Sequence, residues 1–383
     1  LAEALREAGY ATFATSSVPF SGQLSNLQQG VEQLHESASV EDDFGGSKTA
    51  RPLTDRMLEW IDRHRDVPFF AFLHAMDPHS PYEPRPPFNG TWFPLDEREE
   101  FLAQMEGVRE HIENPMMRRF GMPTRQELVE AEIDPEPYVA REKDWYDGSI
   151  LGMDAEIQRI MDRLTELDLI DDVLFVFLSD HGEEFLEHGS HWHGLNAYGE
   201  NTNIPLVLWG PGRVPAGVRV EATVQALDVL PTVLDLSGLE IPEVAQGQSL
   251  VPMMRAAAEG AAPQQLGWQP RPAISERFQM GTVAPAGMVS FDYYSMVHGR
   301  WKLVRKMSLE GETLGHELYD HAADPLDQND LAAEHPEIVE ELVDRLDRWL
   351  AWAEENRLPS DAEAAEGMSA AELERLRSLG YVQ

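Results

Sequence analysis

The sequence predicts an α/β protein with a mostly parallel sheet flanked by helices, followed by a small C-terminal α+β subdomain. Continuously apolar stretches such as DDVLFVFLS (171–179) are typical of strands covered on both faces. Amphipathic helical stretches alternate with them, as in β-α-β units. From about residue 256 the pattern changes to a hairpin and a long helix, which indicates a second structural unit.

Composition limits the possible functions. The 383 residues are long enough for two domains, and a hydrophobic share of 42% supplies a sizeable core. The formal net charge is -38, from 68 acidic and 30 basic residues. Such a surface repels phosphate backbones and anionic membranes, which argues against a nucleic-acid partner. The chain has no cysteine, which excludes disulfides and thiolate metal sites within it, and no apolar run of membrane-spanning length.

The first elements read as part of a β-α-β unit. LAEALREAGYATFATS (1–16) predicts a helix end, a stop at Gly9 and then a strand. Because the strand that should precede this helix is not in the sequence, we expect the chain to begin inside a domain. LTDRMLEWIDRHRD (53–66) predicts a helix with Thr54 as its N-cap, and VPFFAFLHAM (67–76) predicts the next strand.

The middle of the chain predicts a helical excursion and then more sheet. Residues 95–143 are charged and irregular, and we expect helices that run over the surface. Residues 144–170 form one helix with an apolar face. Strands follow at 171–179 and 204–212, both expected to be central and parallel, and 227–239 is a short helix ended by a glycine. The residues of the apolar face are Ile150, Met153, Ile157, Ile160, Met161, Leu164 and Leu167.

The predicted domain boundary falls between residues 255 and 256. AAAEGAAPQQ (256–265) resembles a linker in composition. After it, YYSMVHGRWKLVRK (293–306) predicts a hairpin, HELYD (316–320) a further strand and 336–355 an amphipathic helix. We therefore divide the chain into an α/β domain, 1–255, and a C-terminal α+β subdomain, 256–383.

Groups able to bind a metal gather at the end of the strand 171–179. Asp180 and His181 follow it directly, and three more histidines, His188, His191 and His193, lie on the next loop. Ligands of parallel α/β sheets bind at the carboxyl ends of strands. A carboxylate oxygen and an imidazole nitrogen at this corner are suitable ligands for a divalent cation, and Gly182 would allow a sharp turn beside it.

A second strand end carries similar groups. His74, Asp77 and His79 lie in and just after the strand 67–76. Two strand ends of this kind indicate one shared crevice. In such a crevice a metal would neutralise an anionic ester, and imidazoles would hold its oxygens or protonate the leaving group.

Each of these residues also has a structural interpretation. A lone Asp-His-Gly is often only a turn, His79 could cap a loop, and for His74 a core position is the preferred interpretation. We do not expect both His188 and His191 to belong to the site. Three glutamates, Glu183, Glu184 and Glu187, read as a solvated helical turn.

The order of these segments resembles that of the sulfatase family of the alkaline phosphatase superfamily, over nearly the whole chain. The resemblance implies an alkaline-phosphatase-like fold and hydrolysis of a small-molecule or carbohydrate sulfate ester. The segments that carry it are LAEALREAGYATFAT, FFAFLHAMDPHSPY, WYDGSILGMDAEIQRIMDRLTELDLIDDVLFVFLSDHGEE, LDVLPTVLDLSGL with GQSL, HGRWKLVRK, ELYDHAADPLDQNDLA and LRSLGYV.

The resemblance assigns roles to individual residues. Asp180 matches a metal ligand, and His181 stands where many members have Asn and others His. His79 matches the histidine that contacts the sulfate or phosphate group, and His193 lies near the position of a substrate-binding Lys. The implied roles are metal binding for Asp180 and His181, catalysis for His193 and His79, and substrate binding for these two and His74. The resemblance implies one divalent metal ion, Ca²⁺ or Mg²⁺, while an imidazole ligand favours Mn²⁺ or Zn²⁺.

The sequence also departs from the family pattern. The paired acidic metal motif and the Cys-x-Pro-x-Arg motif, whose Cys matures to formylglycine, are absent, and SSVPFSGQLSNLQQG (16–30) replaces a lysine-containing segment. We therefore expect an N-terminally truncated fragment without its nucleophile, inactive by itself, of a full-length enzyme. Two alternatives stay open: a phosphodiester or phosphonate monoester hydrolase or phosphotransferase, and a non-catalytic metal-binding homologue. The sequence leaves the oligomeric state open, and a signal peptide ahead of residue 1 would make the location periplasmic or extracellular.

Overall fold

The computed structural model describes residues 1–383 except 19–21, 23–24, 37–48, 279–290 and 357–383. The LRSLGYV motif (376–382) and part of the segment 16–30 therefore lie outside the described residues. Among the helices described, none combines the length and apolar character needed to cross a membrane.

The N-terminal part contains a parallel sheet. Helix α1 (Ala2–Glu7) leads into strand β1 (Ala11–Ser16), which lies between β2 (Gln33–Glu36) and β3 (Phe69–Leu73). Both pairings are parallel, with Phe13 opposite Gln33 on one side and Ala71 on the other. The predicted helix-strand order and the parallel sheet are confirmed.

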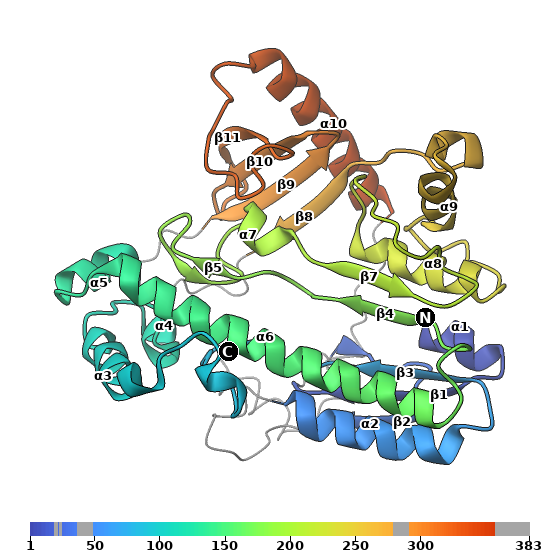
Figure 1. The fold of residues 1–383 in the computed structure, drawn as a ribbon. Coiled ribbons are helices and arrows are strands. Elements are labelled where there is room, and N and C mark those ends of the chain that lie inside the picture. Colours follow the sequence, from blue (N-terminus) through green and yellow to red (C-terminus); the bar gives the residue numbers. More distant parts are fainter. Residues whose placement is uncertain (19–21, 23–24, 37–48, 279–290, 357–383) are drawn as a thin grey trace, which may run out of the picture.

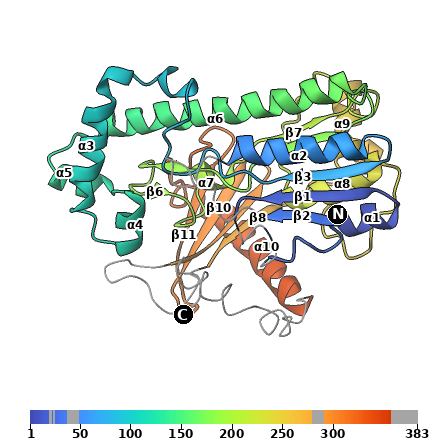
Figure 2. The same ribbon diagram turned by 90° about the horizontal axis from the view of Figure 1, so that it is seen from below.

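Two helices cover one face of this sheet. Helices α2 (Ala50–His64) and α6 (Pro135–Glu166) lie side by side over it (Figure 2), in contact with Phe13 of β1. Of the predicted apolar face of α6, Ile160 and Leu164 are buried here, whereas Ile150 is 44% exposed. The cluster also includes Phe175 from the next strand, so the same helices cover both regions of sheet.

The start of α2 differs from the prediction. The helix begins at Ala50, and Thr54, the predicted N-cap, is buried inside it. A carboxylate from the loop after β3 satisfies the helix start instead, because the N–H groups of Thr49 and Ala50 donate to Asp77 Oδ2, each at 2.8 Å. Because Asp77 lies 27 residues after Ala50, the sequence near the helix start does not reveal this cap.

The strand at 171–179 was assigned the wrong pairing. Strand β4 (Phe175–Leu178) pairs with β7 (Leu206–Trp209), and the two run antiparallel with Phe175 opposite Trp209. An apolar run predicts that both faces are covered but carries no information about strand direction. Within the described residues, parallel pairing is confined to β1, β2 and β3.

The helical excursion is confirmed and has a core of its own. It contains the short helix η4 (Leu95–Glu97), α3 (Arg98–Arg109), α4 (Pro115–Phe120), α5 (Arg125–Glu130) and the first turns of α6; η3 (Phe88–Gly90) lies just before it. Figure 1 shows this group at one end of the long helix α6, with α2 near the other end. Its buried aromatic residues include Phe101, Tyr138 and Trp145, and they pack together with Phe185 and Trp192.

Phe185 and Trp192 belong to a small hairpin formed by β5 (Glu184–Phe185) and β6 (His191–Trp192). Helix α7 (Gly199–Thr202) follows this hairpin. Further on lie η5 (Ala226–Asp228), α8 (Val229–Leu236), α9 (Val251–Glu259) and η6 (Pro263–Leu266). The predicted linker at 256–265 is wrong, because much of it is helical and α9 buries Met253 and Ala256.

The C-terminal part has the predicted α+β organisation. Strands β8 (Ala273–Arg277), β9 (Asp292–His298), β10 (Trp301–Met307) and β11 (Thr313–Asp320) form an antiparallel sheet in the order β11-β10-β9-β8. Helix α10 (Pro336–Glu355) packs on it through Leu342 and Leu346. The fold class is confirmed, and the exact domain boundary at 255/256 stays a prediction.

Candidate functional site

The structure brings the two predicted strand ends together. His193 stacks on His181 with ring centroids 4.0 Å apart, and its ring lies 5.2 Å from that of His79. His74 belongs to the same cluster. Burial lowers its pKa, and it lies near enough to Asp180 and His181 for their charges to affect that pKa as well. All five predicted site residues therefore lie in one cluster, formed by the segments after β3, after β4 and after the β5–β6 hairpin.

The Asp180–His181 corner fits a divalent cation. Asp180 Oδ2 lies 3.7 Å from His181 Nε2, with the two side chains 67% and 40% exposed. His181 Nδ1 lies 2.7 Å from the carbonyl oxygen of Gly182, so Nδ1 carries the proton that it donates, and Nε2 keeps its lone pair. Two acceptors thus face each other. Metal-binding histidines have this same second hydrogen bond to a carbonyl.

This corner supplies two ligands of such an ion. In the described ranges no group of three or more His, Cys, Asp or Glu residues is arranged to hold a metal. Asp180 and His181 would therefore form one part of a coordination shell that needs further ligands.

His193 is held by its backbone and by a buried carboxylate. Trp192 before it has a φ of 88° and Gly194 after it a φ of 71°, so this turn uses left-handed backbone on both sides of His193. His193 Nδ1 lies 3.0 Å from Glu183 Oε1. Burial, and secondarily the nearby His181, lowers the pKa of His193 to about 3, so this imidazole is neutral near pH 7.

His79 and His74 occupy the other side of the cluster. His79 Nδ1 lies 2.8 Å from the carbonyl oxygen of Ser80, and its ring meets Trp192 edge-on at 6.1 Å. His74 Nδ1 lies 2.8 Å from Ser17 Oγ, at the carboxyl end of β1. Ser17 was missed in the sequence, although its place directly after a predicted strand of the same sheet was a usable signal.

The glutamates after the Asp-His-Gly corner were assigned wrongly to a solvated helical turn. Glu183 and Glu184 are buried, and Glu184 opens strand β5. Burial raises the pKa of each of these carboxyls to about 7. Glu184 accepts hydrogen bonds from the N–H groups of His188 and Ser190 and from the Asn196 amide, at 3.0, 2.9 and 2.8 Å.

The other two histidines of the loop serve the structure rather than the site. The His191 side chain is fully buried, 2.8 Å from Glu142 and bonded to the carbonyl oxygen of Pro123. His188 lies between Glu200, at 2.7 Å, and the carbonyl oxygen of Asp327, at 2.9 Å. The histidine-rich loop thus supplies two site imidazoles, His181 and His193, and two structural ones.

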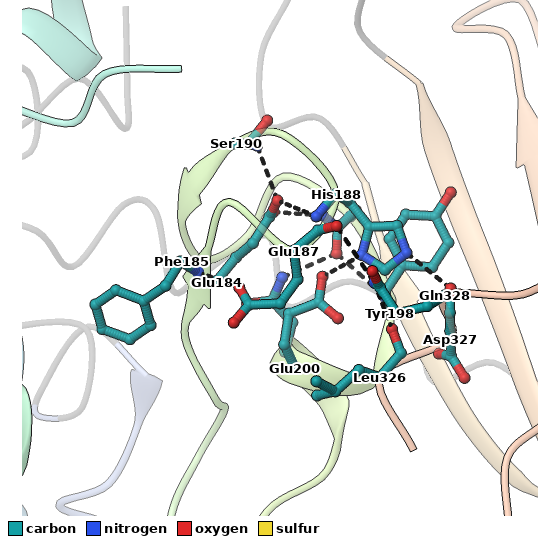
Figure 3. Close-up of polar contacts among 12 residues, drawn as sticks. Glu184, Phe185, Glu187, His188, Ser190, Tyr198, Glu200, Leu326, Asp327 and Gln328 are labelled. Carbon is teal, nitrogen blue, oxygen red and sulfur yellow. Dashed lines mark hydrogen bonds and ion pairs between the residues drawn. The ribbon is translucent and has the colours of Figure 1, made fainter. Parts of the chain in front are cut away.

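Figure 3 shows how this loop contacts residues 326–328, which follow strand β11. Asp327, whose backbone holds His188, forms a fully buried ion pair with Lys302 of β10, with Nζ and Oδ2 2.6 Å apart. Removing one partner of such a pair leaves an uncompensated buried charge, which costs about 3–5 kcal/mol. The C-terminal subdomain therefore fixes the hairpin that carries the site.

Gly182 is required for a different reason from the predicted sharp turn. Its N–H donates to the carbonyl oxygen of Asn201 at 2.9 Å, and an added Cβ would lie 1.9 Å from the carbonyl oxygen of Glu200. A side chain here cannot be accommodated without moving the backbone of α7. The glycine permits close packing of two backbone segments beside Asp180 and His181.

A known protein family matches more than half of the chain. Residues 1–239 match the family profile described as Sulfatase. The chain belongs to the sulfatase family. Residues 187–352 also match the profile described as N-sulphoglucosamine sulphohydrolase, C-terminal. The resemblance stated from its motifs is thereby confirmed.

Curated relatives are considerably longer than the region they share with this chain. A choline-sulfatase of Rhizobium meliloti (strain 1021) is 29% identical over 287 residues, which cover 73% of this chain and 50% of the relative. Arylsulfatase K of Gallus gallus is 29% identical over 314 residues, or 77% and 54% of the two chains. The chain thus spans about half the length of these relatives.

Solved structures share the fold. A protein solved in complex with its substrate D-glucosamine-2-N,6-O-disulfate aligns with a TM-score of 0.63 and 21% identity, over 93% of this chain and 82% of the other. The phosphonate monoester hydrolase of Agrobacterium radiobacter aligns with a TM-score of 0.65 and 20% identity, over 92% and 80%. These neighbours confirm an alkaline-phosphatase-like architecture.

We predict that Gly182→Ala destabilises the protein. The new Cβ would overlap the Glu200 carbonyl, and overpacking of this kind costs about 1–3 kcal/mol or more. Urea unfolding measures the loss. Gly107→Ala is the matched control, because Gly107 lies within α3 and its Cβ would meet nothing within 4 Å, so its stability should be unchanged or slightly higher. Equal stability of Gly182→Ala and the wild type would contradict this packing.

We also predict that Glu184 makes stability depend on pH. Its folded pKa of about 7 lies above the usual 4.5, so its contribution is complete below pH 4.5 and is lost as the pH rises through 7. The shift corresponds to roughly 3 kcal/mol at most. In Glu184→Gln, the fall in the free energy of unfolding between pH 4.5 and 7.5 should be smaller than in the wild type, measured by urea unfolding at each pH.

Glu187→Gln is the control for that experiment. Burial of Glu187 is outweighed by its hydrogen bonds to Lys143 and to the N–H of Phe185, so its pKa is lowered. This carboxylate stabilises the fold above its unfolded pKa. Its removal should lower the free energy of unfolding at neutral pH. The decrease in this free energy that Glu184 causes as the pH rises should remain. An unchanged pH slope in Glu184→Gln would disprove the assignment.

Proposed function

We propose that the protein carrying this chain is a metal-dependent hydrolase of sulfate esters. The observation that carries the proposal is the convergence of two strand ends, with the Asp180–His181 corner in contact with His193, and His193 near His79. Membership of the sulfatase family supports the reaction class. A tetrahedral anion and a cation could meet in this cluster.

In this proposal Asp180 and His181 hold the divalent cation through a carboxylate oxygen and an imidazole nitrogen that lie 3.7 Å apart. Sulfatases are in general metal-dependent, and a bound cation supplies Lewis-acid stabilisation of charge on the ester. His79 contacts the sulfate oxygens, His193 acts beside the ion, and His74 with Ser17 lines the substrate side. The imidazole of His181 favours Mn²⁺ or Zn²⁺, whereas the family pattern implies Ca²⁺ or Mg²⁺.

We propose a carbohydrate or other small sulfate ester as substrate. One structural neighbour was solved with a sulfated glucosamine, and one relative is a choline-sulfatase. The alcohol part of the substrate would meet the helical excursion, because Phe120 of α4 packs against Trp192 with ring centroids 4.7 Å apart, directly beside His193. Residues 95–143 therefore contribute to the wall of the site.

A phosphodiester or phosphonate monoester is the second candidate substrate. The groups proposed to bind the anion are imidazoles, and none of the proposed site residues is Lys or Arg. Imidazole carries less fixed positive charge than an ammonium group, which weakens any preference for sulfate over phosphate. The fold shared with a phosphonate monoester hydrolase is compatible with this alternative.

We predict that Asp180→Ala in the complete protein abolishes metal-dependent turnover and leaves the fold intact. Loss of a metal ligand should reduce kcat/KM by more than the 10–100-fold typical of second-shell changes. The assay compares aryl sulfate with aryl phosphodiester, after chelation and after return of Ca²⁺, Mg²⁺, Mn²⁺ or Zn²⁺. Asp154→Ala removes an exposed carboxylate on α6 and should change nothing.

The same assay tests the function itself. Hydrolysis of the sulfate ester that is lost on chelation and restored by one cation supports the proposal. Preference for the phosphodiester would favour the second candidate. Turnover of Asp180→Ala within about tenfold of the wild type would exclude Asp180 as a required ligand, since even second-shell changes usually cost 10–100-fold.

A further inference from the structure

Glu183, which the sequence predicted to lie in a solvated helical turn, contacts His193. Its side chain is 5% exposed, and its Oε1 lies 3.0 Å from His193 Nδ1. The hydroxyl of Tyr82, a fully buried residue, also hydrogen-bonds to the Glu183 side chain. A buried carboxylate with two fixed partners is a rigid support for the imidazole.

The ring of His193 is fixed on its other sides as well. His181 stacks on it, the Trp192 indole lies 4.6 Å away and the His79 ring 5.2 Å away, centroid to centroid. Its side chain is nevertheless 17% exposed. Within the described residues, Nδ1 of His193 has a hydrogen-bond partner, Glu183, and no partner is seen for Nε2.

We propose that Glu183 is a positioning residue that holds neutral His193 as the Nδ1–H tautomer. In its ionised form the Glu183 carboxylate only accepts hydrogen bonds, so in that form Nδ1 must carry the proton and Nε2 must keep its lone pair. The second nitrogen then faces the site as an acceptor. A carboxylate or carbonyl partner commonly fixes the tautomer and orientation of a functional histidine in this manner.

The tautomer decides what His193 can do in the proposed reaction. With a lone pair on Nε2 it can accept a hydrogen bond from a nucleophile or water, or donate its lone pair to a cation. It cannot donate a hydrogen bond to an anionic oxygen from that atom until it has gained a proton. The inference therefore deepens the proposed function, since it makes His193 an acceptor at the start of the reaction rather than an acid.

The test reads the tautomer directly and needs no turnover. In ¹⁵N-labelled protein without added metal, long-range ¹H–¹⁵N correlation spectra distinguish protonated from unprotonated ring nitrogens of each histidine. The wild type should show His193 protonated on Nδ1 and unprotonated on Nε2 at a pH well above 7, where the Glu183 carboxyl is ionised. An Nε2–H tautomer or an imidazolium in the wild type would overturn the inference, whatever reaction the protein catalyses.

Variants at Glu183 separate the hydrogen bond from the charge. Glu183→Gln keeps an acceptor oxygen and should keep the Nδ1–H tautomer. Glu183→Ala removes that oxygen and should shift His193 towards the Nε2–H form. Glu187→Gln alters a carboxylate of the same hairpin that contacts Lys143, and should leave the His193 signals unchanged. Unchanged signals in a folded Glu183→Ala would contradict the proposal.

Kinetics of the complete protein add a second, separable result. Glu183→Ala should lower kcat by about 10–100-fold with KM changed much less, and Glu183→Gln should restore most of it. If the tautomer behaves as expected but no ester is hydrolysed, the proposed function fails and this inference stands. If hydrolysis occurs and the tautomer does not depend on Glu183, the inference fails and the function stands.

Discussion

The site depends on buried carboxylates that hold the β5–β6 hairpin against the rest of the protein. Glu184 uses both of its oxygens on this segment, binding the N–H groups of His188 and Ser190 and the amide of Asn196. These contacts help to return the chain to the end of β4 at His193. Charged groups are costly to bury and remain buried only when they are paired or hydrogen-bonded, so a segment rich in them has few alternative conformations. The hydrogen bonds to Glu184 therefore allow this carboxyl group to stay buried.

The N-terminal sheet and the C-terminal sheet both support the candidate site. On one side, α2 and α6 cover β1 and β3, and Asp77 ties the loop after β3 to the start of α2. On the other side, the buried Lys302–Asp327 pair joins the C-terminal sheet to the loop that contains His188. The imidazoles of the site thus come from segments that are anchored independently. Sites supported by several rigid elements keep their geometry, which binding of a metal and an anion requires.

Sequence patterns predicted what depends on local periodicity and on order along the chain. The helices, the apolar strands and the α+β end were visible as patterns of apolar residues, and the Asp-His-Gly corner stood where a buried strand ended. The antiparallel pairing of β4 with β7 was not visible, because an apolar strand looks the same in either direction. The buried state of Glu183 and Glu184 was not visible either, since a run of glutamates reads as exposed until distant partners such as Tyr82 are known. His188 and His191 could not be separated from His193 for the same reason.

The central claim is that the Asp180–His181 corner and the imidazoles of His193 and His79 share one cavity. Substoichiometric Mn²⁺ tests it most directly, because this paramagnetic ion broadens NMR signals of nuclei close to it. We expect the ring signals of His181, His193 and His79 to broaden first and those of His188 and His191 to broaden later, and we expect Asp180→Ala to remove the effect. Broadening that is equal at all these histidines, or that spares His193 and His79 while His181 disappears, would contradict the account.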